Sequence, residues 1–439
     1  MGTAKVLPLL VSMSIPAMFS MLIQSLYNVV DSIFVAQLDE FALTAVSLAF
    51  PVQQLMIAVG VGTAIGTGSL ISRRLGEKRR EEASLAAENG LFLAALSYLL
   101  FALLGLFGTE TFIRAFASSE IVAEYSCTYT YIVTIGSFGL FLSSCLEKTL
   151  QATGNMIFPM LIQLTGAVTN IVLDPIMIFG LFGFPKLGVA GAALATILGQ
   201  ILGMVLAAIL VHCREHEVNF ELKKFRPRAG VIREIYAVGF PSIIMQAISS
   251  VMVSFLNLIL IRFSEAAVSV LGAYFKLQSF VFMPVFGLNQ GVMPVIGYNY
   301  GARQRHRVTS AVKVGCSIAV CIMAAGTVLF WAVPAQLLSI FNASETMLAI
   351  GVPALRIIST CFVAAALGIL FSTAFQALGH GFNSLIISVL RQLVILLPAA
   401  FLLARIGLEA VWLAFPIAEL VALAASILLY LRLYKQVIC

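Results

Sequence analysis

The sequence predicts an all-α polytopic membrane protein with twelve transmembrane helices in two six-helix bundles, and three observations support this prediction. First, 61% of the 439 residues are hydrophobic and only 10% are charged, whereas an average soluble domain is about 45–50% apolar and about 25% charged. Second, the mean hydropathy of +1.03 comes from apolar runs of about 20 residues or more, the length that crosses a bilayer. Third, the chain contains an internal repeat.

Apolar runs between polar breaks define the twelve expected helices. They are residues 8–38, 43–72, 84–107, 119–146, 156–182, 188–212, 235–261, 268–297, 310–332, 346–376, 383–404 and 408–431. Several contain proline, which removes a backbone donor and favours a bend. Pro16 lies in the first of these helices.

The basic residues orient these helices. With the N-terminus inside and the direction alternating, 19 of the 26 Lys and Arg residues fall on the cytoplasmic side. Such a bias is the usual mark of the inner side of a membrane, so both chain ends are expected in the cytoplasm. The same clusters account for the net charge of +6 without a nucleic-acid partner.

One constant offset aligns the two halves of the chain. It pairs Pro16 with Pro241, Gly62 with Gly287, Gly66 with Gly291, and Gln151-Ala152-Thr153-Gly154 with Gln376-Ala377-Leu378-Gly379. After residue 183 a slightly shorter offset applies, which pairs Gly188 with Gly407. We therefore expect a lobe at 1–213, a basic linker at 214–234 and a second lobe at 235–439. Six helices per repeat give both lobes one orientation, as in transporters whose halves rock against each other.

Polar side chains form one stripe on the first expected helix. Gln24, Tyr27, Asn28 and Asp31 are spaced by three, four and seven residues, which places them on one helix face. Ionisable residues inside a membrane are costly and are candidates for function.

A second stripe lies on the fifth and sixth expected helices. Gln163, Asn170 and Asp174 share a face of the fifth, and Thr196 and Gln200 are four residues apart on the sixth. Asp31 and Asp174 should lie at similar depth, where their oxygens could bind protons or a small cation such as Na⁺. The second half has Leu256 and Ala399 at the matching positions. A purely structural pairing of these groups stays open.

Other polar and adaptable residues are candidates for a substrate cavity. They are Gln53, Gln163, Gln200, Lys276, Gln278, Phe280, Met283, Arg391 and Glu419. Methionine surfaces tolerate varied ligands. Lys276, Arg391 and Glu419 either pair with one another or take part in transport.

Motifs for other chemistries are absent from the sequence. It has no nucleotide-binding P-loop, no HExxH and no GxSxG, which argues against direct use of ATP and against a membrane enzyme. The seven cysteines show no CxxC or zinc spacing. We expect no metal and no cofactor beyond a coupling ion, H⁺ or Na⁺.

These motifs together resemble the multidrug and toxic-compound extrusion family, and most closely its bacterial cation-coupled branch. The resemblance rests on Tyr27-Asn28-Val29-Val30-Asp31, Asn170-Ile171-Val172-Leu173-Asp174-Pro175, Gly191-Ala192-Ala193-Leu194-Ala195-Thr196 and Gly297-Tyr298-Asn299-Tyr300-Gly301. It implies antiport of amphipathic, often cationic, compounds against H⁺ or Na⁺ by alternating access. It also implies that Asp31 and Asp174 bind the ion, that Asn170 and Thr196 assist, and that the first helix bends near Pro16.

The expected setting is the bacterial inner membrane, with a monomer that contacts lipid and small amphipathic substrates. The alternative is a flippase for a lipid-linked saccharide with the same two-bundle plan. Its cavity would need basic residues for phosphates, and only Lys276, Arg356 and Arg391 could supply them.

Overall fold

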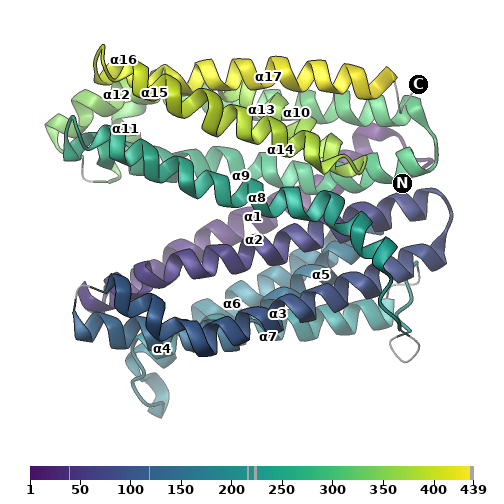
Figure 1. Cartoon of the computed structure of the whole chain (residues 1–439), viewed down its shortest axis with the longest axis horizontal. Helices are drawn as coiled ribbons and strands as arrows, with labels where there is room; N and C mark the ends of the chain where they lie inside the picture. Colours follow the sequence, from purple (N-terminus) through teal and green to yellow (C-terminus); the bar gives the residue numbers. More distant parts are fainter. Residues whose placement is uncertain (39, 118, 215–216, 222–224, 342, 436–439) are drawn as a thin grey trace. The chain divides into compact units, whose positions relative to one another are not determined.

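The computed structural model describes residues 1–435 except 39, 118, 215–216, 222–224 and 342, without the side chains of residues 28, 29, 32, 36, 40, 43 and 214. The described chain consists almost entirely of helices joined by short connections (Figure 1). Its helices in the first half are α1 (Val6–Ala36), α2 (Glu40–Gly76), α3 (Arg80–Phe116), α4 (Glu120–Ile135), α5 (Phe138–Ala152), α6 (Ile157–Phe179), the short η1 (Leu181–Gly183) and α7 (Val189–Arg214).

The second half repeats this series. Its helices are α8 (Ala229–Leu260), α9 (Glu265–Gly301), α10 (Arg305–Ala332), α11 (Pro334–Ser339), α12 (Glu345–Ser359), α13 (Phe362–Ala377), α14 (Gly381–Val389), the π-helical η3 (Leu390–Leu396), α15 (Leu397–Leu403), α16 (Leu408–Trp412) and α17 (Ala414–Leu433). Among the described residues, ten helices are long and apolar enough to span a membrane, or up to twelve if each of two bent pairs is one span. The chain is a multi-pass membrane protein.

Equivalent positions in the two repeats have the same local structure. The Ser119 side chain accepts a hydrogen bond from the Val122 backbone N–H at the start of α4, and Ser344 accepts one from Met347 at the start of α12. Such side-chain caps satisfy an otherwise unpaired helix donor. Gly154 and Gly379 take positive φ values of 97° and 86° just after α5 and α13, a conformation that favours glycine.

Two expected helices are broken in the structure. The spans predicted at 119–146 and 346–376 each consist of two helices, α4 with α5 and α12 with α13, bent by 42° and 49°. Neither break contains a proline; Gly136 lies at the first and Cys361 at the matching place in the second. A hydropathy pattern cannot reveal such a bend, because both arms remain apolar.

The chain forms two compact units. The N-unit comprises residues Phe19–Ile243, and the C-unit comprises Met1–Met18 and Ile244–Cys439. The expected lobes were divided at the linker, but the unit boundaries fall inside α1 and α8. These boundaries come two residues after Pro16 and two residues after Pro241, so each helix contributes its first part to the unit built mainly by the other repeat.

Close backbone contacts at two glycines explain why the first parts of α1 and α8 belong to these units. In the N-unit, a Cβ on Gly66 would clash with the carbonyl oxygen of Ile235, so α2 packs on the backbone of α8. In the C-unit, a Cβ on Gly291 would lie 3.0 Å from Cα of Ser14, so α9 packs equally closely on α1. Small residues permit such backbone contacts between membrane helices.

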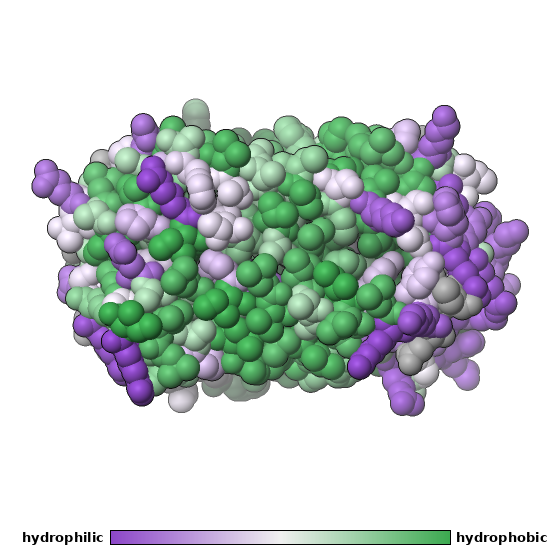
Figure 2. All heavy atoms as spheres, turned by 90° about the horizontal axis from the view of Figure 1, so that it is seen from above, coloured by the Kyte–Doolittle hydropathy of each residue, from purple (hydrophilic) through white to green (hydrophobic). Residues whose placement is uncertain are grey.

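Apolar side chains dominate the middle of the protein surface. Figure 2 shows hydrophobic residues across the centre of the visible face and hydrophilic ones towards the two ends. Leu104, Leu258 and Leu428 are among the exposed large hydrophobic side chains. A bilayer would cover such side chains.

Candidate ion and substrate sites

The carboxyl groups of Asp31 and Asp174 meet inside the N-unit. Asp31 lies on α1 and Asp174 on α6, and their side chains are within hydrogen-bonding range of each other. Asp174 is fully buried, and Oδ1 of Asp31 is buried without a hydrogen-bond partner among the described residues. An ionised carboxylate only accepts hydrogen bonds. The contact therefore requires that a proton or a cation offset the negative charge of the pair.

Asn170 and Thr196 complete this cluster. With its amide oriented to satisfy both neighbours, Asn170 donates from its nitrogen to Oδ2 of Asp174 at 3.1 Å and accepts from the Thr196 backbone N–H at 3.2 Å. The Thr196 hydroxyl donates to the carbonyl oxygen of Ala192 at 3.0 Å. Asn170 lies one helical turn before Asp174 on α6, so the shared face of this helix positions both.

Two tyrosines border the acid pair. Tyr27 of α1 lies within electrostatic reach of Asp31 and Asp174, one turn from Asp31 as the stripe predicted. Tyr129 of α4 is buried, lies within electrostatic reach of the same two acids, and accepts a hydrogen bond from Gln53 at 3.0 Å. Tyr129 could not be predicted from the sequence, because a single tyrosine in an apolar helix carries no spacing signal.

The remaining members of the predicted stripes lie differently. Gln24 is exposed, and Gln200 is half-buried on α7 one turn after Thr196. The side chain of Asn28 lies outside the described residues. Gln163 binds elsewhere: its amide nitrogen donates to Oε2 of Glu147 at 3.0 Å.

Glu147 forms a second buried polar cluster in the N-unit. Besides Gln163, it accepts a hydrogen bond from the Ser143 hydroxyl at 3.0 Å. The neighbouring Lys148 donates to Gln151 at 2.7 Å. Glu147 lies one residue beyond the expected helix end at 146, but α5 continues to Ala152, so the hydropathy pattern did not indicate this acid.

The C-unit contains an ion pair. Nη1 of Arg391 on η3 lies 3.1 Å from Oε1 of Glu419 on α17, one of the two arrangements left open by the sequence. Lys276 does not share it, since its ammonium lies over the ring of Phe341, 5.8 Å from the centroid.

The other C-unit candidates follow α9. Phe280 is 54% exposed, while Gln278 and Met283 are half-buried. Within the C-unit, the structure brings Arg391 and Glu419 together, and a substrate role for the other cavity candidates stays a prediction.

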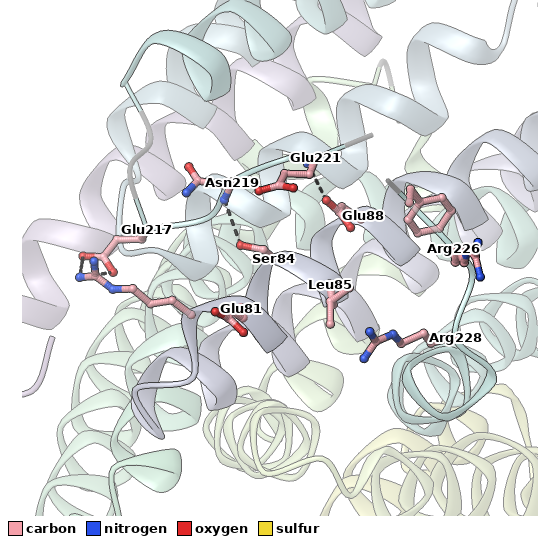
Figure 3. A pocket seen from close by; sticks show the side chains of 11 residues that line it. Glu81, Ser84, Leu85, Glu88, Glu217, Asn219, Glu221, Arg226 and Arg228 are labelled. Carbon is pink, nitrogen blue, oxygen red and sulfur yellow. Dashed lines mark hydrogen bonds and ion pairs between the residues drawn. The ribbon is translucent and has the colours of Figure 1, made fainter. Parts of the chain in front are cut away.

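A pocket of about 580 Å³ lies in the N-unit where the linker crosses α3 (Figure 3). The linker is held by α3 side chains: Asn219 N–H donates to Ser84 at 3.0 Å, and Glu221 N–H donates to Glu88 at 2.6 Å. Arg80 pairs with Glu217 at 3.0 Å on the pocket wall. Both acidic and basic side chains line the pocket, and their contacts hold the linker against α3.

The repeated helical units, the membrane-spanning surface and the buried acid pair define a multi-pass membrane transporter. The profile of the MatE family matches residues 16–176 and 241–402, once in each half. The chain belongs to the MatE family.

Relatives of known name agree with this assignment. Proteins named multidrug export protein MepA match from Staphylococcus saprophyticus, with 28% identity over 95% of this chain and 92% of the relative, and from Staphylococcus haemolyticus, with 27% identity over the same shares. Among solved structures, an outward-facing multidrug resistance MATE transporter of the MOP superfamily matches with a TM-score of 0.92 and 29% identity over 99% of both chains. A MOP superfamily transporter from Pyrococcus furiosus matches with a TM-score of 0.91 and the same identity and shares.

Proposed function

We propose that this chain exports amphipathic cationic compounds in exchange for protons, as a monomer in the bacterial cytoplasmic membrane with both ends in the cytoplasm. Family membership supports a transport role, and the printed names of the relatives support multidrug export. The excess of basic residues on one side of the expected topology supports the orientation.

One observation carries the ion assignment: the buried contact between the carboxyl groups of Asp31 and Asp174. A bound proton lets one group donate to the other, whereas two ionised groups would repel. With its amide oriented to satisfy both neighbours, Asn170 donates to Oδ2 of Asp174. A proton on the acid pair leaves this hydrogen bond in place, because a protonated carboxyl group still accepts.

The exchange follows from the two ionisation states of the pair. A shared proton holds α1 against α6 through the two carboxyl groups, and loss of that proton drives the helices apart. Because α1 passes from one unit into the other near Pro16, displacement of Asp31 acts on the helix that joins the units. Protons and drug are exchanged when each binds a different state more tightly.

The test uses proteoliposomes loaded under an imposed pH gradient or an imposed Na⁺ gradient, with ethidium as the substrate. We expect the pH gradient alone to drive ethidium against its concentration gradient. Asp31→Asn and Asp174→Asn should abolish this accumulation, because an amide cannot exchange a proton. Glu124→Gln removes an exposed acid of the same unit and should leave transport intact.

Three results would contradict the proposal. Uphill movement driven only by Na⁺ would refute the proton assignment. Transport that survives both substitutions would refute the site. No movement under either gradient would favour the flippase alternative, which the paired charge of Arg391 now disfavours, since Glu419 offsets the positive group that a phosphate would need.

A further inference from the structure

The Arg391–Glu419 pair lies near the middle of the membrane. Arg391 is ten residues from the start of α14 and twelve from the end of α15. At about 1.5 Å per residue, these are about 15 and 18 Å, within a hydrocarbon core of about 30 Å. The side chains are 27% and 16% exposed. Charged residues at this depth are costly and usually functional.

The pair is unique to the second repeat. The offset that pairs Pro16 with Pro241 relates Arg391 to Gly166, and the offset that pairs Gly188 with Gly407 relates Glu419 to Gln200 and its neighbour Ala418 to Gly199. In the N-unit, a Cβ on Gly199 would lie 2.7 Å from the carbonyl oxygen of Gly166, so α6 and α7 touch through their backbones. The C-unit has Arg391 and Ala418 at these two positions, and Arg391 pairs with Glu419, the neighbour of Ala418.

The backbone around Arg391 departs from the α-helix. Residues Leu390–Leu396 form a π-helix, a rare form that is frequent at functional sites. Gln392 in the π-helix is 4% exposed, and its Oε1 is an acceptor without a partner among the described residues. The π-helix thus presents an unused buried acceptor next to Arg391.

Glu419 has hydrogen-bonding capacity that its contact with Arg391 does not use, and it lies close to aromatic rings. A single hydrogen bond, Nη1 to Oε1, joins it to Arg391 within the described chain, rather than the bidentate contact that is the strongest geometry. Phe415 is one turn away on α17 and packs edge-on against Tyr274, with centroids 5.8 Å apart. Tyr274 is buried and within electrostatic reach of Glu419. A carboxylate next to aromatic rings is the environment that binds organic cations.

We propose that Glu419 binds the positive group of the exported compound, and that Arg391 occupies Glu419 when no substrate is bound. Arg391 is an internal competitor: a cation that enters the C-unit displaces its guanidinium, and the guanidinium returns when the cation leaves. The ligand class is a monovalent aromatic cation, since one carboxylate is offered. This inference rests on the proposed export of cationic compounds and names the residue that recognises the charge.

The test measures equilibrium binding of ethidium to the purified full-length protein in lipid nanodiscs. Arg391→Met removes the competitor and should tighten binding about tenfold, because Glu419 is released. The double variant Arg391→Met/Glu419→Gln removes both charges together, so neither is left buried and unpaired. It should weaken ethidium binding about tenfold relative to the wild type. Glu409→Gln, an exposed acid of the same unit, should bind as the wild type does.

The outcomes separate this inference from the proposed function. If the double variant binds ethidium with wild-type affinity, the pair only stabilises the fold and the inference is overturned. A wild-type protein that binds no ethidium would instead refute the cationic substrate class itself. In the Asp31→Asn background, Arg391→Met should still tighten ethidium binding relative to the same background without it, although proton-driven transport is lost. A fault in ion coupling is thereby distinguished from a fault in cation recognition.

Discussion

The attachment of the linker to α3 can be broken by one substitution, Glu88→Ala. The Glu88 side chain is 5% exposed, and its Oε1 accepts the Glu221 backbone N–H at 2.6 Å. A hydrogen bond to a charged group contributes about 1.5–3 kcal/mol. Its loss should raise the population of the open linker about 10- to 150-fold, since about 1.4 kcal/mol corresponds to a factor of ten.

Limited trypsin digestion measures this opening. Trypsin can cut after the exposed linker residue Arg228 when the linker leaves α3, whereas Arg226 precedes Pro227 and is not a trypsin site. The cleavage rate at Arg228 follows the open population when closing is fast. Asn89→Ala removes a neutral acceptor for the Arg228 N–H, bonded at 3.0 Å, and should have a smaller effect, about 2- to 10-fold. Glu81→Ala changes an exposed acid of the same pocket wall and is the control.

The order of the trypsin cleavage rates of the three variants tests this explanation of how the linker is held. Glu88→Ala should be cut fastest, Asn89→Ala next and Glu81→Ala at the wild-type rate. Equal rates for Glu88→Ala and Glu81→Ala would refute the argument that buried side-chain acceptors hold the linker. The ring contact of the linker, Phe225 on Phe92 at 5.6 Å, is unchanged in all three variants, so differences report the hydrogen bonds alone.

Two further predictions concern the repeat. Gly66→Ala places a Cβ against the backbone of Ile235 and should lower the free energy of unfolding by about 1–3 kcal/mol, seen as a lower thermal unfolding midpoint. Gly272→Ala is the control, because a Cβ there meets nothing within 4 Å. Equal unfolding midpoints for the two variants would contradict close backbone packing at Gly66. Ser344→Ala removes the cap of α12 and should cost about 1 kcal/mol, which Ser344→Thr should largely restore; an unchanged midpoint would show that this cap does not limit stability.

The local order of the chain was predictable from its residues. Composition and the spacing of apolar runs indicated membrane helices, because the bilayer requires their length and apolarity wherever they lie. The repeat was visible in identical residues, and the structure confirms it in the caps at Ser119 and Ser344 and in the positive φ of Gly154 and Gly379. Helical periodicity also placed Asp31 and Tyr27, and Asn170 and Asp174, on shared faces.

Partners on different helices depended on the tertiary structure. Periodicity gives the face of one helix but not which other helix packs against it. Gln163 therefore shares a stripe with Asp174 in sequence and yet binds Glu147, while Tyr129, which has no stripe, lies beside the acids.

The same limit applies to bends and unit boundaries. The breaks between α4 and α5 and between α12 and α13 leave hydropathy unchanged, and the assignment of the two parts of α1 to different units depends on what each part packs against. The residues by themselves determined that this protein spans a membrane in two related halves, with Asp31 and Asp174 in the first and no acid at the matching positions of the second. Only the tertiary structure decided that Asp31 meets Asp174 and that Arg391 meets Glu419, because such contacts form between helices far apart in the chain.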